Sequence, residues 1–259
     1  MPRRTKPTSL PAPFLKRLTL KEALPQAPSY PLDLPFLHDD FEINFEQPVT
    51  IIIGENGSGK STLVEAIAGL AGFDQAGGGQ GYRPVDHAQA IDVSGSGLGD
   101  HLRAGWLPKV TRGWFFKAET FFSVARYLDR AAVETYKPPP DFLSWSHGEG
   151  FVRFFEERMS EQGIYFLDEP ESALSPRRQI ELLRLLSDIQ RSARAQVIMA
   201  THSPILMAVP QADLWRLTHR GLAPTNLFDT DHFRLYRAFT EDPDGFIKSA
   251  MMGDWDGLT

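Results

Sequence analysis

Apolar and polar residues alternate along this 259-residue chain in a pattern that predicts buried strands separated by amphipathic helices. Three short runs are apolar almost without interruption, which is typical of strands at the centre of a parallel sheet. These runs are residues 49–53, 164–167 and 197–200. Further strands are expected at residues 113–118, at 41–45 with one polar face, and at 14–20 as a short strand.

Apolar residues at helical spacing follow several of these runs. Leu63, Ile67 and Leu70 share one face of a helix that is expected over residues 62–71. A helix over residues 147–161 would turn an aromatic stripe inward, and such a stripe is read as core rather than as a ligand-binding surface. Its members are Phe151, Phe154, Phe155 and Met159.

Two more helices complete the alternation. Ser175 as N-cap and Pro176 at the first position begin one of them, and residues 121–133 are expected to form the other. Strands that alternate with helices in this way predict an α/β fold with a mostly parallel sheet. The C-terminal residues are expected to complete the core with a strand and a helix. They include Trp215, Phe233, Tyr236 and Phe239.

Composition narrows the class of protein. The 27 Lys and Arg residues against 33 Asp and Glu residues give a net charge of −6, which provides no global basic field for nucleic acid. The chain has no cysteine, which excludes disulfides, thiol catalysis and thiolate metal sites, and which suits a reducing compartment.

Targeting signals are not expected in this sequence. Residues 1–17 are basic and proline-rich but have no apolar stretch of secretory length. Nowhere do about 18 apolar residues run together, so we expect no membrane span. We therefore expect a cytoplasmic protein, whose role at a membrane, if any, would come through a partner.

The strongest chemical signal is a phosphate-binding loop that fits G-x-x-x-x-G-K-[ST] at every fixed position. Its residues are Gly54, Glu55, Asn56, Gly57, Ser58, Gly59, Lys60, Ser61 and Thr62. Glycines permit positive φ, so that backbone N–H groups converge on an anion together with the N-terminus of the next helix. Lys60 supplies a charge for the outer phosphates, and the Ser61 hydroxyl can bind Mg²⁺. A chance Gly-rich turn is the alternative, but it does not explain the strand before and the helix after.

The second motif is the acidic pair Asp168-Glu169 at the end of the apolar run 164–167. This pattern places both carboxylates at the carboxyl edge of the sheet, where ligands of open α/β folds bind. Asp168 is a candidate for holding Mg²⁺, and Glu169 for orienting an attacking water. An acidic turn that only caps a strand is the alternative reading.

Two further motifs remain ambiguous when each is read alone. Residues 144–150 place serines and glycines at a predicted helix N-terminus, which forms either an anion site or an ordinary helix cap. His202 follows the strand at 197–200, where it either contacts a γ-phosphate or acts as a structural partner.

In this chain order the four motifs resemble the ABC-type ATPase family of P-loop NTPases, over about residues 36–205. Residues 146–149 read Ser-His-Gly-Glu instead of the Ser-Gly-Gly-Gln usual in transporter ATPases. This segment is similar to a compact bacterial branch of predicted ATPases that is related to repair and chromosome-maintenance ATPases.

The resemblance implies a role for each motif. Residues 54–62 would be the Walker A loop, Asp168 the Walker B acid, Glu169 the catalytic base and His202 the switch histidine. Residues 172–175 would face a partner subunit. The signature residues Ser146, Gly148 and Glu149 would contact ATP held by the other protomer. The expected working unit is therefore an ATP-dependent head-to-tail homodimer.

The resemblance also implies a domain organisation. A proline-rich arm over residues 1–35 would precede a RecA-like core formed by residues 36–118 and 162–259, with an antiparallel β edge. Residues 119–161 would form a helical subdomain. Glu119 would take the place of the glutamine that senses Mg²⁺, and Tyr30 is the candidate for stacking on adenine.

The function expected from the sequence is hydrolysis of MgATP to ADP and phosphate, coupled to a conformational switch on an unknown protein partner. Two alternatives stay open: the nucleotide-binding subunit of a transporter, and a nonhydrolysing module whose associations are gated by ATP. A role on DNA is unsupported, because the stretch between Lys60 and Ser146 is too short for a long coiled-coil insertion and no C-terminal nuclease is expected.

Overall fold

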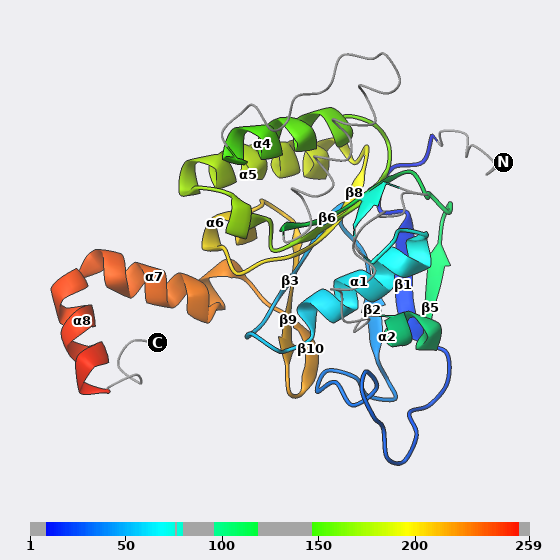
Figure 1. Cartoon of the computed structure of the whole chain (residues 1–259), viewed down its shortest axis with the longest axis horizontal. Coiled ribbons are helices and arrows are strands. Elements are labelled where there is room, and N and C mark those ends of the chain that lie inside the picture. The colour runs from blue at the N-terminus through cyan, green and yellow to red at the C-terminus, as the bar shows by residue number, and fades with distance from the viewer. Residues whose placement is uncertain (1–8, 76, 80–95, 119–146, 254–259) are drawn as a thin grey trace.

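Two sheets organise the described part of the chain, which in this computed structural model comprises residues 9–75, 77–79, 96–118 and 147–253 (Figure 1). The larger sheet has seven strands in the order β10-β9-β3-β8-β7-β6-β4. Their bounds are β3 Val49–Ile53, β4 Gly78–Gly79, β6 Gly113–Lys117, β7 Ile164–Asp168, β8 Gln196–Ala200, β9 Asp213–Thr218 and β10 Gly221–Pro224. The inner strands run parallel, and β10 and β4 pair antiparallel at the two edges. The predicted α/β fold with a mostly parallel sheet and an antiparallel edge is confirmed.

The three apolar runs of the sequence form neighbouring strands in this sheet. β3 pairs with β8, and β8 pairs with β7. Every residue of these three strands is buried, which explains why most of their positions are apolar. Because the strands are parallel, their carboxyl ends meet at one edge, and the phosphate-loop residues, Asp168 and His202 meet there.

Helices cover both faces of the larger sheet (Figure 1). The helices α1 (Lys60–Ala71) and α2 (Ser96–His101) lie on one face, and α4 (His147–Arg158), α5 (Pro176–Ser192) and α6 (Pro204–Met207) lie on the other. Successive strand residues point to opposite faces. Ile52 therefore packs in the cluster that contains α1, whereas Ile51 packs in the cluster that contains α4 and α5.

The expected helices agree with the observed ones to within a few residues. α1 begins at Lys60, two residues before the expected start, because Gly59 takes the N-cap position. α4 ends at Arg158 instead of 161, and its described aromatic residues are buried in the core as expected. Ser175 caps α5 as predicted. The helix expected at residues 121–133 lies outside the described residues, so the division into core and helical subdomain stays a prediction.

The proline-rich N-terminal arm contributes the central strand of a second, antiparallel sheet. Its strands, in the order β2-β1-β5, are β1 Leu15–Leu20, β2 Glu42–Asn44 and β5 Leu102–Trp106. The side chain of Gln196 ties the arm to the main sheet, since its Oε1 accepts from Phe14 N and Leu15 N at 2.8 Å and its Nε2 donates to Leu15 O at 3.0 Å. The short strand expected at 14–20 is confirmed.

The C-terminal segment corrects one prediction. Its strand β9 joins the sheet beside β3, but α7 (Asp231–Glu241) and α8 (Pro243–Met252) contain no buried residue and extend away from the sheet (Figure 1). Tyr236 and Phe239 are exposed instead of completing the core. The rings of Phe239 and Phe246 pack against each other between the two helices, with centroids 5.6 Å apart. The apolar character of these residues did not specify which surface covers them.

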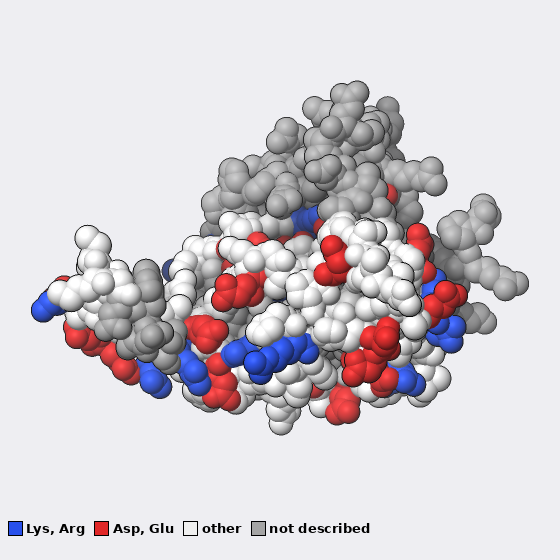
Figure 2. All heavy atoms as spheres, turned by 90° about the horizontal axis from the view of Figure 1, so that it is seen from below, with Lys and Arg blue, Asp and Glu red and all other residues white. Residues whose placement is uncertain are grey.

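The charged side chains do not form a single basic field on the face that Figure 2 presents. One short band of Lys and Arg lies near the centre of this view with Asp and Glu on either side of it, in line with the net charge of −6. A short band between acidic groups differs from the extended basic stripe that follows a phosphate backbone. Within the described ranges, no helix combines the length and apolar character that crossing a bilayer requires.

Candidate active site

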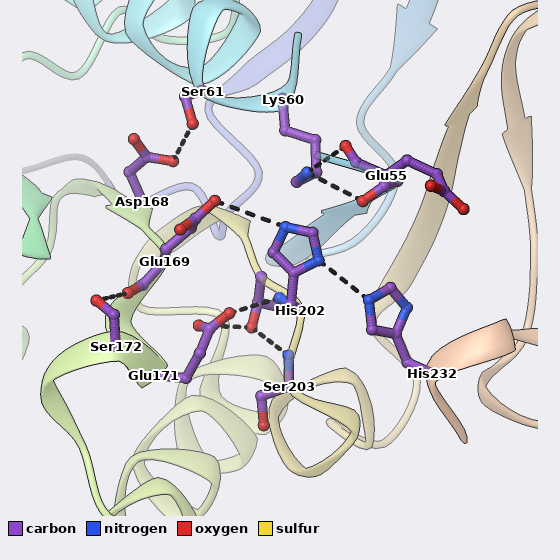
Figure 3. Close-up of polar contacts among 12 residues, drawn as sticks. Glu55, Lys60, Ser61, Asp168, Glu169, Glu171, Ser172, His202, Ser203 and His232 are labelled. Carbon is purple, nitrogen blue, oxygen red and sulfur yellow. Dashed lines mark hydrogen bonds and ion pairs between the residues drawn. The ribbon is translucent and has the colours of Figure 1, made fainter. Parts of the chain in front are cut away.

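The predicted site residues gather at the carboxyl edge of β3, β7 and β8 (Figure 3). The phosphate loop connects β3 to α1, Asp168 ends β7, and His202 follows β8. The site is therefore a direct consequence of strand order, because only parallel neighbours bring these three segments to one edge.

The loop has the backbone conformation that its glycines were expected to allow. Gly57 and Gly59 have φ values of 75° and 92°, in the left-handed region that favours glycine. Gly59 is also sterically required, since a Cβ there would lie 2.8 Å from Phe36 Cε1. The hydroxyl of Ser58 is buried and makes no hydrogen bond among the described residues. A buried, unpaired hydroxyl in a concave loop is a fitting partner for a phosphate oxygen.

Lys60 is held inside the loop. Its ammonium donates to the carbonyl oxygens of Gly54 and Glu55, each at 2.9 Å, and the residue is 4% exposed (Figure 3). Burial lowers the pKa of Lys60, and the carboxylates of Glu169 and Asp168 oppose that effect. The charge is therefore positioned beside the loop before any phosphate arrives.

Ser61 and Asp168 form the pair that the sequence assigned to a metal ion. Ser61 Oγ donates to Asp168 Oδ1 at 3.0 Å across two elements that are 107 residues apart in the sequence. Asp168 is buried, and that burial raises its pKa to about 6, opposed by the Ser61 hydrogen bond and by the nearby charge of Lys117. A hydroxyl and a buried carboxylate at hydrogen-bond distance match the oxygen ligands that Mg²⁺ takes in nucleotide sites, so the residues present fit the ion.

Lys117 and Glu65 form an ion pair near Ser61 and Asp168, and the sequence analysis did not identify it. Lys117 ends β6 opposite Asp168 in the strand register, and its Nζ lies 2.5 Å from Glu65 Oε1 on α1. Both side chains are almost buried. Neither residue belongs to a recognised motif, and only the pairing of β6 with β7 reveals their position.

Glu169 is the exposed carboxylate of the site. Its backbone adopts a φ of 47°, and its N–H donates to Ala200 O at 3.0 Å, while its carbonyl accepts from Ser172 Oγ at 2.9 Å. These bonds hold a strained turn that directs the side chain into the site (Figure 3). The side chain is 43% exposed, so water reaches it.

Glu171 is a further residue that the sequence analysis missed. Its two carboxylate oxygens accept from Thr201 Oγ1 at 2.7 Å and from His202 N at 2.5 Å. Burial raises the pKa of Glu171, and these hydrogen bonds oppose that rise. Glu171 thus ties the segment after β7 to the segment after β8. The third acid in the run Asp168-Glu169-Pro170-Glu171 was the available signal.

His202 points toward Glu169, as a site residue would. Its Nε2 lies 3.6 Å from Glu169 Oε1, and its Nδ1 lies 3.0 Å from His232 Nε2 (Figure 3). Burial lowers the pKa of His202, and the charge of Lys60 lowers it further. A neutral imidazole beside a carboxylate is suited to donate one hydrogen bond to an oxygen anion.

A cavity of about 460 Å³ opens beside the loop. Its lining comes from β3, the loop, β9 and α7, and includes Gly54, Asn56, His202, Arg216, Asp231 and His232. The cavity therefore joins the loop to the C-terminal segment, which the sequence analysis had assigned only to the core.

Other predicted site residues are placed less completely. Tyr30 reaches the loop, since its hydroxyl lies 3.3 Å from Thr62 Oγ1, and half of its surface is exposed. Ser146 and Glu119 lie outside the described residues. Gly148 and Glu149 belong to the first turn of α4, as the predicted helix N-terminus requires. The roles assigned to all these residues remain predictions.

Two protein-family models match separate parts of the chain. One is described as "AAA domain" and matches residues 34–95, which contain the phosphate loop. The other is described as "AAA domain, putative AbiEii toxin, Type IV TA system" and matches residues 148–208, which contain the two acids and His202. Together the two matched segments hold the phosphate loop, the two acids and His202.

Curated relatives cover a longer part of the chain than either family model. The chain is 28% identical over 192 residues to the thiamine import ATP-binding protein ThiQ of Cereibacter sphaeroides, covering 66% of this chain and 74% of that protein. It is 28% identical over 189 residues to the zinc import ATP-binding protein ZnuC of Paracoccus denitrificans, covering 68% of this chain and 66% of that protein. A structure of the SMC head domain from Thermotoga maritima aligns with a TM-score of 0.47 at 19% identity, over 82% of this chain and 99% of that one.

Proposed function

We propose that this chain, a P-loop ATP-binding domain of the ABC-type ATPase family, hydrolyses MgATP to ADP and phosphate. The observation that carries the proposal is the convergence at one sheet edge of a buried ammonium, a hydroxyl–carboxylate pair and an exposed carboxylate. These are Lys60, the pair Ser61–Asp168, and Glu169. Phosphoryl transfer needs positioned charges and a positioned water, and this edge supplies groups for each.

The loop would bind the triphosphate. Its backbone N–H groups and the N-terminus of α1 would receive phosphate oxygens, and the buried hydroxyl of Ser58 would donate to one of them. Lys60 would exchange its two carbonyl contacts for the outer phosphates. Tyr30 lies next to the loop and is proposed to contact the adenine ring.

Ser61 and Asp168 would hold Mg²⁺, with Glu119 as a further proposed contact. When bound, the ion neutralises charge on the β- and γ-phosphates and on the phosphoryl group during transfer. Asp168 must be ionised for this role, and the nearby charge of Lys117 supports its ionised form. The Lys117–Glu65 ion pair would keep the carboxylate in position.

Glu169 and His202 would act on the reacting atoms. Glu169 would accept a hydrogen bond from the attacking water, whose oxygen forms a bond to the γ-phosphorus while the bond to the bridging oxygen of ADP breaks. The proton of that water passes to Glu169 and then to solvent. His202 would donate from Nε2 to a γ-phosphate oxygen, and Glu171 would hold the His202 backbone in place.

The second half of the site is proposed to come from another copy of the chain. Ser146, Gly148 and Glu149 would contact the γ-phosphate in trans, within a head-to-tail homodimer that encloses two ATP molecules. The start of α4 at His147 supports this role, because a helix N-terminus with glycine in its first turn presents free N–H groups to an anion. Dimer closure would then act on a protein partner in the cytoplasm.

The variant Glu169→Gln tests the reaction. It should bind ATP as the parent protein does, lose turnover by at least about a hundredfold, and accumulate as an ATP-dependent dimer in size-exclusion chromatography. Glu46→Gln is the control, since Glu46 is exposed in the segment between β2 and β3 and should leave turnover unchanged. Turnover that survives in Glu169→Gln would remove Glu169 from its role. ATP binding by the parent without any Mg²⁺-dependent turnover would favour the nonhydrolysing module.

A transporter subunit is the second candidate, because the curated relatives ThiQ and ZnuC are named as import ATP-binding proteins. Affinity purification of Glu169→Gln in the presence of ATP would separate the candidates. Stoichiometric recovery of one integral membrane protein supports the transporter, whereas recovery of a soluble partner supports a switch that acts elsewhere.

A further inference from the structure

A second histidine, His232 at the start of α7, reaches the active site from outside the four sequence motifs (Figure 3). Its Nε2 lies 3.0 Å from Nδ1 of His202. The contact spans 30 residues of sequence and joins the segment after β8 to the first turn of α7. His232 also lines the cavity beside the phosphate loop.

We propose that His232 is a positioning residue that donates Nε2–H to His202 Nδ1 and thereby holds His202 in the tautomer with its proton on Nε2. The inference rests on the proposed function, in which His202 donates to a γ-phosphate oxygen. His232 itself touches neither the phosphate nor the water. It acts on the reaction only through His202.

The number of ring protons allows two tautomers of His202, and the charges beside its Nε2 select one of them. A hydrogen bond between two ring nitrogens holds one proton, and a neutral imidazole carries one N–H. If His202 placed its proton on Nδ1, its Nε2 would present a lone pair to the oxygens of Glu169 and of an incoming phosphate, all of which carry negative charge. With His232 as the donor, His202 keeps Nε2–H for those oxygens. Burial lowers the pKa of both histidines, so the neutral forms dominate.

The surroundings of Nε2 support this assignment. The distance of 3.6 Å to Glu169 Oε1 is longer than a hydrogen bond, and Nε2 of His202 is buried without a hydrogen-bond partner among the described residues. A buried polar atom of this kind indicates a ligand contact that is completed on binding. An Nε2–H gains a hydrogen-bond partner when a phosphate oxygen arrives. A bare Nε2 would instead face that oxygen with a lone pair, and the repulsion would weaken binding.

The start of α7 is built to hold His232 in place. Thr230 is fully buried and caps the helix, since its hydroxyl accepts from Phe233 N at 3.2 Å and donates to Leu227 O at 2.7 Å. His232 is the second residue of α7, so the cap fixes its backbone directly. The exposed C-terminal helices are thereby connected to the reacting centre through one side chain.

The test compares His232→Phe, which keeps an aromatic ring but has no donor, with His232→Gln, whose amide donates from a similar position. The Phe variant should lose about 10- to 100-fold in kcat while its Kd for ATP changes less than about threefold, as expected for a group that orients a ligand-contacting residue. The Gln variant should return kcat to within about fivefold of the parent. His101→Phe, at an exposed position on α2, is the control for exchanging a histidine for a phenylalanine away from the site.

A double variant separates coupling from general damage. If His232 acts only through His202, His202→Ala with His232→Phe should be no slower than His202→Ala alone. Additive losses in the double variant, an unchanged kcat in His232→Phe, or a His232→Gln variant as slow as His232→Phe would each overturn the inference.

A spectroscopic measurement tests the tautomer without relying on turnover. Long-range ¹H–¹⁵N correlation spectra of the histidine-labelled protein should show protonated Nε2 and bare Nδ1 for His202, and His232→Phe should shift His202 toward the other tautomer. A parent protein with His202 protonated on Nδ1 would refute the inference even if it hydrolyses ATP. The predicted tautomer in a protein without turnover would leave the inference standing and refute the proposed function.

Discussion

Replacing Asp168 with asparagine is expected to stabilise the metal-free protein at neutral pH, although it removes a proposed ligand of Mg²⁺. Burial raises the pKa of Asp168 from its ordinary value of 3.8 to about 6. The difference of about two pH units corresponds to about 3 kcal/mol of unfavourable free energy for keeping the ionised carboxylate in the folded state at pH 7. Asparagine carries no charge, and its amide oxygen can still accept the hydrogen bond from Ser61.

The pH dependence has a definite sign. Between pH 4 and 6 the folded protein holds a proton on Asp168 that the unfolded chain has released, so the folded state binds more protons. The stability of the parent therefore falls as the pH rises through this window, and this contribution is constant above about pH 7. The advantage of Asp168→Asn should accordingly be about 3 kcal/mol at pH 7.5, about half of that at pH 5, and small at pH 4.

Urea denaturation in EDTA, without nucleotide, measures this difference at pH 5 and pH 7.5. Glu169→Gln is the matched control, since it neutralises the adjacent but 43% exposed carboxylate and should change the free energy of unfolding by less than about 0.5 kcal/mol. In saturating MgATP the parent should be the more stable of the two proteins, because only the parent gains the free energy of binding the ion. An Asp168→Asn protein that is no more stable than the parent at pH 7.5, or equally advantaged at both pH values, would refute the reasoning.

Two further predictions concern stability. Gln196→Leu should lower the free energy of unfolding by about 3–6 kcal/mol, because it leaves three buried hydrogen bonds to the N-terminal arm unmade; a urea titration showing a loss below about 1 kcal/mol would contradict this account. Gly59→Ala should be more destabilising than Gly57→Ala by at least about 1 kcal/mol. Both positions have a left-handed φ, but only at Gly59 would the added Cβ clash with Phe36. Equal shifts in melting temperature in the two variants would show that this clash does not affect stability.

The sequence was informative where chemistry and periodicity coincide within one segment. Local sequence patterns were enough to predict the loop around Lys60, the apolar strands before that loop and before Asp168, and the cap at Ser175. Glycine spacing, apolar runs and capping residues each act over only a few positions. The structure adds that the hydroxyl of Ser61 and the carboxylate of Asp168 meet at 3.0 Å, which follows from β3, β8 and β7 being neighbours.

The residues that the sequence did not reveal are those that connect segments. Gln196 joins β8 to the arm, Glu171 joins the segment after β7 to the one after β8, and His232 joins α7 to His202. Each has a partner at least 30 positions away, so no local pattern predicts the contact. The exposed surface of α7 was missed because the aromatic character of Tyr236 and Phe239 does not determine whether they are buried.

Hydrogen bonds within the site explain how it can keep buried charges before ATP binds. Lys60 and Asp168 are both nearly excluded from water. Burial lowers the pKa of Lys60 and raises the pKa of Asp168, which favours the neutral form of each. Such groups destabilise the folded state unless surrounding contacts fix them, as the carbonyl oxygens do for Lys60 and the Ser61 hydroxyl does for Asp168. In the proposed function, the triphosphate and its Mg²⁺ would bring the opposite charges that both groups require. We therefore expect binding to be coupled to stability at this edge of the sheet, and the reversal of order between Asp168→Asn and the parent in MgATP is the direct measure of that coupling.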